Sequence, residues 1–164
     1  DLPTAQFNQS LMSLRRPAFS LLETLVVVAI MAVAVGFSVL YAQTDTVRTD
    51  LRTQAAIFVS YAREMQTDAA SGKGNTSAGI HLELDQYVLF HGASYNALDA
   101  SNFAVVLPSV IEITNISLAG GGSDLVFTSP LGEPSQSGSL DFSSSSIGQT
   151  VHITVNSLGA VDYE

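Results

Sequence analysis

The most prominent feature of the hydrophobic pattern is one uninterrupted apolar run near the start of the chain. No polar side chain occurs between Leu25 and Phe37, and only Ser38 interrupts the run before Ala42. Counted from Phe19, about 24 residues at 1.5 Å per residue give a helix of about 36 Å, enough to cross a hydrocarbon layer of about 30 Å. The run therefore predicts a helix that spans a membrane.

After this run the pattern becomes amphipathic. Apolar side chains recur at steps of three and four, which is the spacing of one face of an α-helix. They are Val47, Leu51, Ala55, Phe58, Ala62, Met65 and Ala69. No proline lies between Pro17 and Pro108, so nothing forces a break. We therefore predict one long helix from about Ser20 to Ala70, with its first half in lipid and its second half packed on a domain.

The glycine-rich segment 71–75 ends the predicted helix, and the pattern then changes to short strands. Val151, Ile153 and Val155 alternate with polar residues, which favours a sheet with one buried face. A hairpin is predicted across Asp85-Gln86. The predicted strands are 80–84, 87–90, 103–107, 111–118, 125–127, 140–142, 151–155 and 158–163. The pattern thus predicts an α+β fold, a helix followed by an antiparallel β domain.

Charge is distributed unevenly along the chain. The basic residues all lie in the first 73 positions: Arg15, Arg16, Arg48, Arg52, Arg63 and Lys73. Residues 74–164 contain nine acids and no lysine or arginine. Because such a region does not attract phosphate backbones, we expect no nucleic-acid partner for it. Arg15 and Arg16 precede the apolar run, so the positive-inside rule places the N-terminus in the cytoplasm.

Residues suited to catalysis or metal binding are few. The absence of cysteine excludes a disulfide framework, a cysteine-ligated zinc site and a thiol nucleophile. His81 and His91 lie in neighbouring predicted strands that could bring them together, but neither they nor His152 have the spacing of a known metal site. The acids are scattered singly, unlike a calcium loop, and the serines of 143–146 have no histidine and aspartate arranged with them. We therefore predict no metal, no cofactor and no enzymatic activity.

A single acid, Glu23, lies at the start of the apolar run. A charged acid at the centre of a bilayer costs about 2.5–3.5 kcal/mol, but Glu23 is at the cytoplasmic margin, where it can stay hydrated. If the chain is cut after Ala18, the new amino group of Phe19 becomes a cation near this acid. Glu23 can then neutralise that amine on its own helix or on a neighbouring one.

Residues 15–42 resemble the type III signal of type IV pilins and type II secretion pseudopilins. Those families carry a basic leader, a cleavage site before a phenylalanine, a glutamate early in the mature chain and a long apolar stretch. The resemblance implies that prepilin peptidase recognises Arg15-Arg16, cuts between Ala18 and Phe19, and N-methylates Phe19. It also implies that Glu23 sets the register of subunits during assembly. Those families nearly always have glycine immediately before the cut, where this sequence has Ala18.

The β-rich region resembles the GspH/FimT branch of minor pseudopilins, through segments 78–81, 87–90, 125–134 and 153–159. The resemblance implies a structural subunit that enters the bacterial inner membrane with its N-terminus inside. It would then assemble with other pilin or pseudopilin subunits into a type IV pilus-like or type II secretion filament, in the periplasm or on the cell surface. The implied organisation is a leader (1–18), an assembly half (19–42) and an amphipathic half (43–71) of the helix, and a globular domain (72–164).

Other interpretations of the apolar run remain open. It resembles a secretory signal peptide if Ala32-Val33-Ala34 is a cleavage site, although the run is long for that and continues into an amphipathic helix. A twin-arginine signal fits poorly with Pro17-Ala18. The alternative function is a signal-anchored extracellular β-domain binding module, such as an adhesin or a DNA-uptake pilin. An exported enzyme has only the secretion signal in its favour.

Overall fold

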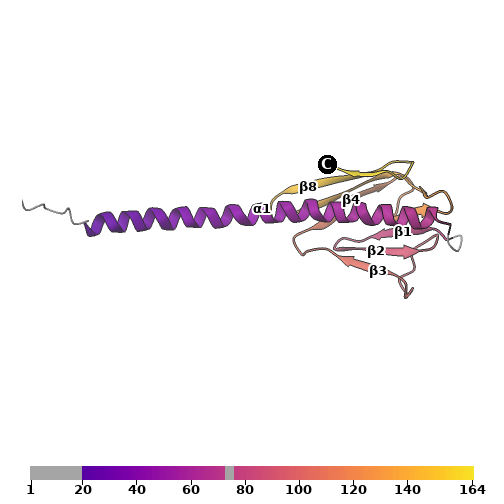
Figure 1. Cartoon of the computed structure of the whole chain (residues 1–164), viewed down its shortest axis with the longest axis horizontal. Coiled ribbons are helices and arrows are strands. Elements are labelled where there is room, and N and C mark those ends of the chain that lie inside the picture. The colour runs from indigo at the N-terminus through magenta and orange to yellow at the C-terminus, as the bar shows by residue number, and fades with distance from the viewer. Residues whose placement is uncertain (1–19, 73–75) are drawn as a thin grey trace, which may run out of the picture. The chain divides into compact units, whose positions relative to one another are not determined.

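The computed structural model describes residues 20–72 and 76–164. One helix, α1 (Leu21–Ala70), precedes nine strands in the described part of the chain (Figure 1). The strands are β1 (Ala78–Leu82), β2 (Gln86–His91), β3 (Phe103–Val106), β4 (Glu112–Leu118), β5 (Asp124–Thr128), β6 (Glu133–Pro134), β7 (Gly138–Ser144), β8 (Gln149–Val155) and β9 (Val161–Tyr163). Every strand pair is antiparallel. The structure therefore confirms the predicted α+β class, with an apolar N-terminal helix followed by antiparallel sheets.

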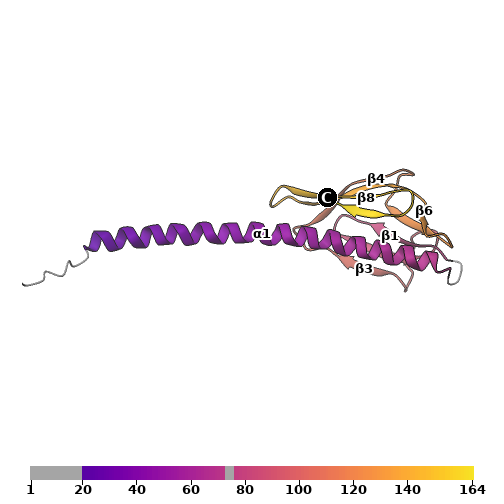
Figure 2. The ribbon, with the colours of Figure 1, turned by 45° about the horizontal axis from the view of Figure 1, so that its top comes forward.

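The chain divides into two compact units, Asp1–Leu40 and Tyr41–Glu164. The described part of the first unit is the apolar portion of α1. The second unit contains the amphipathic portion of α1 and all the strands. Figures 1 and 2 show that, within this second unit, the helix lies along both groups of strands.

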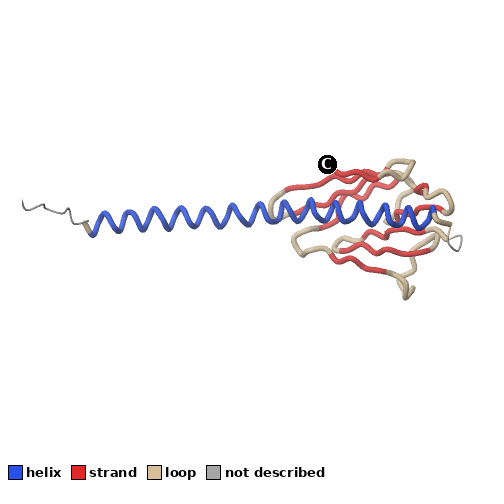
Figure 3. The backbone as a smooth tube through the Cα atoms, viewed as in Figure 1, coloured by secondary structure: helices blue, strands red, loops and turns tan. Residues whose placement is uncertain are grey.

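The strands of the second unit form two sheets, which appear as two groups of red strands in Figure 3. The first sheet has the order β3-β2-β1-β5-β6, and the second has the order β4-β7-β8-β9. Sequence neighbours therefore pair within β1–β3 and within β7–β9, whereas β1 pairs with β5 and β4 with β7 across longer stretches of chain. Strands β3 and β6 are the edges of the first sheet, and β4 and β9 are the edges of the second.

The amphipathic portion of α1 supplies the centre of the core. The predicted apolar stripe is buried at six of its seven positions: Leu51, Ala55, Phe58, Ala62, Met65 and Ala69. Val47 is half-buried. The ring of Phe58 lies 5.2 Å from that of Tyr87 on β2 and 5.6 Å from that of Phe142 on β7, centroid to centroid. One helical side chain thus contacts both sheets, and burial of this face holds the unit together.

The two sheets bury their faces differently. In β8, Val151, Ile153 and Val155 are buried while the residues between them are exposed, which confirms the prediction of one buried face. The first sheet is covered on its second face as well, where Phe90 is 1% exposed and packs against Tyr95 at 5.7 Å. A side chain at Gly79 would come within 2.7 Å of the Phe90 ring, so only glycine lets that ring lie across β1.

Three details differ from the sequence prediction. The hairpin turn is formed by residues 83–85, so Gln86 belongs to β2 and Leu84 is 60% exposed. The strand predicted over 158–163 is shorter, because residues 156–160 form a turn closed by the Asn156 side chain, which accepts from two backbone N–H groups. A two-residue strand, β6, lies outside all the predicted strands. In the first two of these details, turn chemistry outweighed hydrophobic alternation.

Candidate functional site

The apolar portion of α1 begins with a side-chain cap. The hydroxyl oxygen of Ser20 accepts a hydrogen bond from the backbone N–H of Leu22 at 3.2 Å, and the Ser20 carbonyl accepts from the N–H of Glu23 at 3.0 Å. Serine before the first turn with glutamate three residues later is the pattern of a capping box. This pattern was present in the sequence, and the structure places it at the helix start.

Glu23 lies in the first turn of α1, with its side chain exposed. A carboxylate there is favoured by the partial positive charge of the helix N-terminus. Among the described residues, no cation pairs with it. The helix therefore presents one carboxylate, at its start, that is free to meet an amine.

The surface that follows Glu23 is apolar on all sides. The window Leu21–Ser38 is long and apolar enough to cross a membrane, and none of it is buried against the rest of the chain. Its large side chains are between 46% and 83% exposed. A helix that is hydrophobic all round needs lipid or other helices around it.

The other predicted site residues lie outside the described part of the chain. These are Arg15, Arg16, Ala18 and Phe19, which the resemblance assigns to leader recognition, cleavage and N-methylation. The structure therefore bears only on Glu23 among the predicted processing and assembly residues.

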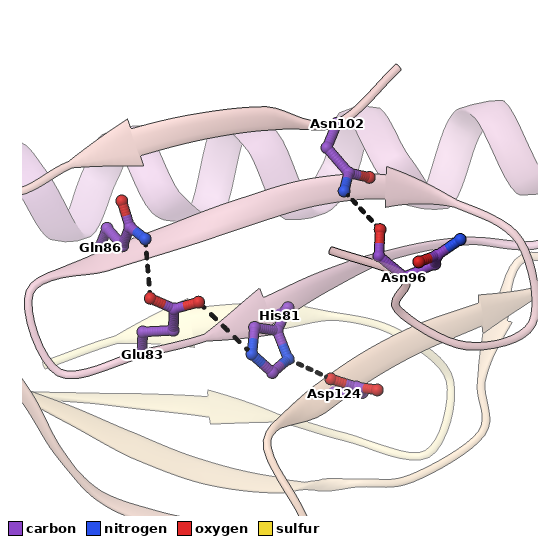
Figure 4. A network of polar contacts seen from close by, with 6 residues as sticks. All are labelled: His81, Glu83, Gln86, Asn96, Asn102 and Asp124. Carbon is purple, nitrogen blue, oxygen red and sulfur yellow. Dashed lines mark hydrogen bonds and ion pairs between the residues drawn. The ribbon is translucent and has the colours of Figure 1, made fainter. Parts of the chain in front are cut away.

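His81 belongs to a polar network on the first sheet (Figure 4). Its Nδ1 lies 2.5 Å from Oδ1 of Asp124 on β5, and its Nε2 lies 3.6 Å from Oε1 of Glu83. The Gln86 side chain donates to the other Glu83 oxygen at 2.7 Å. The imidazole also stacks on the Tyr95 ring at a centroid distance of 4.0 Å. The network thus pins the loop after β2, which carries Tyr95, against the sheet.

His152 and Asp141 form a second network on β8 and β7. Asp141 is buried, and its two carboxylate oxygens meet Nδ1 of His152 at 2.5 Å and the side-chain amide of Asn115 at 2.8 Å. Burial alone raises the pKa of Asp141, but the hydrogen bonds from Asn115 and His152 outweigh it, so the pKa lies below the usual value. Asn115 has a φ of 51°, beside the irregular register of β4.

The histidines do not form a metal site in the described part of the chain. His91 lies 3.5 Å from Asp68 on α1, and β1–β2 register separates it from His81 by three rungs of the ladder. Each histidine thus pairs with a different acid. No group of three or more His, Asp or Glu side chains in residues 20–72 and 76–164 could hold a metal ion. Sequence reasoning missed the pairs with Asp124, Asp68 and Asp141 because each of these acids lies on a different strand or helix from its histidine.

Comparison with known proteins identifies no relative. No protein-family model, no curated protein and no solved structure matches the chain. The fold itself defines an α+β protein with an exposed apolar N-terminal helix.

Proposed function

We propose that this protein is a pilin-like structural subunit, of the minor pseudopilin kind. In this proposal, prepilin peptidase removes residues 1–18 and N-methylates Phe19. The apolar portion of α1 first anchors the subunit in the inner membrane. The subunit then enters a type IV pilus-like or type II secretion filament in the periplasm or at the cell surface. The β domain faces outward and contacts other subunits or cargo.

The observation that carries this proposal is the difference in exposure between the apolar and the amphipathic portions of α1. From Leu21 to Ser38 the helix is apolar and exposed all round, with one free carboxylate, Glu23, in its first turn. From Leu51 to Ala69 the same helix has one buried stripe that supports two sheets. An ordinary membrane anchor needs no carboxylate at its start and no continuation into the core of a domain.

Glu23 has a defined task in this proposal. A cut before Phe19 leaves a positively charged amine, and burying an unpaired charge between apolar helices is costly. The Glu23 carboxylate can neutralise that amine on a neighbouring subunit. Subunits then associate in one register, because only that register pairs the two charges.

Glu23→Gln tests the assembly role. The variant keeps the size of the side chain and loses its charge, so we expect normal membrane insertion and loss of most incorporation into filaments. Thr24→Ala is the matched control, because Thr24 is exposed beside Glu23 and its hydroxyl donates to the Leu21 carbonyl at 2.9 Å. The measurement is the share of subunit in sheared filaments against the share in membranes, in cells that make prepilin peptidase.

Mass spectrometry of the mature N-terminus belongs to the same experiment. If wild type and both variants all carry N-methyl-Phe19, the loss of incorporation into filaments arises in assembly rather than in processing. Normal incorporation of Glu23→Gln would exclude the assembly role. A mature chain that begins after Ala34 would contradict the pilin-like proposal and support a secreted protein.

A further inference from the structure

The second unit contains a pocket of about 330 Å³ between α1, β2 and the start of β3. Its apolar walls come from Tyr61 and Met65 on α1, Leu89 on β2 and Phe103 on β3. Tyr61 and Phe103 lie 6.3 Å apart, centroid to centroid, with their rings tilted by 53°. Phe103 is 55% exposed, so an incoming group can reach its ring.

The charge around this pocket is negative. Glu64 and Asp68 line it from α1, and both are exposed. Asp99 lies close by, where its carboxylate accepts from the backbone and the hydroxyl of Ser101, which lines the pocket. These hydrogen bonds lower the pKa of Asp99. His91 is the one lining residue that can carry positive charge, since no lysine or arginine lines the pocket in the described chain.

The pocket adjoins an open sheet edge. Strand β3 is the outer strand of its sheet, with β2 on one side and no strand on the other among the described residues. The N–H of Leu107 donates to the Asp85 carbonyl, so the antiparallel pattern turns the backbone N–H and C=O groups of Ala104 and Val106 toward the open side. The strand carries no charge and no proline, the usual protections of an edge.

From this juxtaposition we propose that β3 and the pocket form a docking site for an extended segment of another protein, with an arginine in the pocket. The segment adds a strand beside β3 through the backbone groups of Ala104 and Val106. Its arginine lies against the faces of Tyr61 and Phe103, where aromatic rings attract cations. The guanidinium then donates to the carboxylates of Glu64 and Asp68.

The charge distribution indicates a partner other than a second copy of this chain. None of the strands β1–β9 contains a lysine or an arginine, so no strand of a second copy could bring an arginine or a lysine to the pocket. With a net charge of −9, two copies also repel one another. The site therefore selects a basic segment from a different protein. It does not depend on cleavage of the chain or on assembly of α1.

A synthetic peptide can test the site on the full chain in detergent micelles. The probe is a short fluorescein-labelled peptide of alternating threonine and valine with one central arginine, and binding is followed by fluorescence anisotropy. We expect Glu64→Gln combined with Asp68→Asn to weaken binding about tenfold, because two charge-assisted contacts are lost. We expect the affinity to fall as salt rises, since the carboxylates are exposed.

Three controls make the result specific. Glu112→Gln combined with Asp162→Asn removes two exposed acids from the second sheet and should leave the affinity unchanged. A peptide with glutamate in place of arginine should bind at least about tenfold more weakly. Val106→Pro should also weaken binding, because it removes a donor from the open edge but not from the pair with β2. Near-UV circular dichroism checks that each variant stays folded.

Two patterns of measurable binding would overturn this proposal. One is equal binding of the arginine and glutamate peptides, which would mean that the pocket does not distinguish a positive side chain from a negative one. The other is an equal loss of affinity for the acid variants of the pocket and of the second sheet, which would mean a diffuse effect of net charge. Absence of binding by the arginine peptide would also refute the site.

Discussion

At the scale of single residues, Asp141 is the one buried carboxylate among the described residues. It is 9% exposed and holds Asn115 and His152 across three neighbouring strands. A buried carboxylate is tolerated only when its oxygens are paired, and here both are. The contacts favour the charged form over the protonated one, which is why its pKa is lowered in spite of burial.

Asp141→Asn should therefore destabilise the protein in a pH-dependent way. The folded pKa lies below the unfolded one, so the carboxylate contributes stability above the unfolded value and loses it as the pH falls through the folded pKa. We expect a loss of about 1–2 kcal/mol at pH 7, and a smaller loss near pH 3. Urea unfolding of the full chain at both pH values measures it.

The control for this prediction is Glu112→Gln, which alters an exposed acid on β4, the neighbouring strand. It should change the unfolding free energy little at either pH. An equal loss at pH 7 and pH 3 for Asp141→Asn would show that packing of the side chain, rather than its charge, is what matters.

At the scale of elements, α1 and the sheets differ in how far the sequence determines them. The stripe from Leu51 to Ala69 has the period of a helix, and it is buried as predicted. The pairing of β1 with β5 joins Ile80 to Leu125 across a long stretch of chain. Each strand's alternation says which face is buried but not which strand is its neighbour, so the two sheet orders could not be predicted.

Among the contacts between elements, those of Phe58 are expected to contribute most to the free energy of unfolding. Its side chain is fully buried and its ring contacts Tyr87 of one sheet and Phe142 of the other. Phe58→Ala should lower the free energy of unfolding by about 3–5 kcal/mol, through lost burial and the cavity left between the sheets. Urea denaturation in detergent micelles, followed by near-UV circular dichroism of the tyrosines, measures it.

Ile57→Ala is the matched control, one position earlier in the helix. Ile57 is 36% exposed, so truncation there should lower stability much less than truncation of Phe58. Comparable losses for the two variants would contradict the assignment of Phe58 as the contact that joins the helix to both sheets.

The candidate site shows the same limit of sequence reasoning. The lone acid, the leader arginines and the Ala18–Phe19 junction are local patterns, so they can be found by inspection. The pocket beside β3 combines Tyr61 from the helix with Phe103 from a distant strand. The stack of His81 on Tyr95 likewise depends on how the loop after β2 folds back. Such contacts exist only once the fold has formed.

At the scale of the whole molecule, we expect membrane retention to depend on the first unit and folding stability to depend on the second. The apolar window of α1 has no buried side chain, whereas the core of Tyr41–Glu164 is complete without it. Ile30→Glu should therefore reduce retention in membranes, because an acid at the centre of such a helix costs about 2.5–3.5 kcal/mol. Unfolding of the β domain should occur at an unchanged midpoint. Membrane fractionation and thermal unfolding in detergent test the two statements.

The comparison variant is Ile57→Glu, which places the same charge on an exposed position of α1 outside the apolar window. It should leave membrane retention as in wild type. Equal retention of the Ile30 variant and wild type would argue against insertion of the apolar window.

The confinement of basic residues to the first part of the chain has a practical consequence. Trypsin cuts only after lysine and arginine, so no strand from β1 to β9 contains a cleavage site. The arginines of the described chain, Arg48, Arg52 and Arg63, all lie in α1. A protease needs locally unfolded backbone. Tryptic cleavage after Arg48, Arg52 or Arg63 in the native protein therefore reports the opening of one helix, and no tryptic cut falls within the strands.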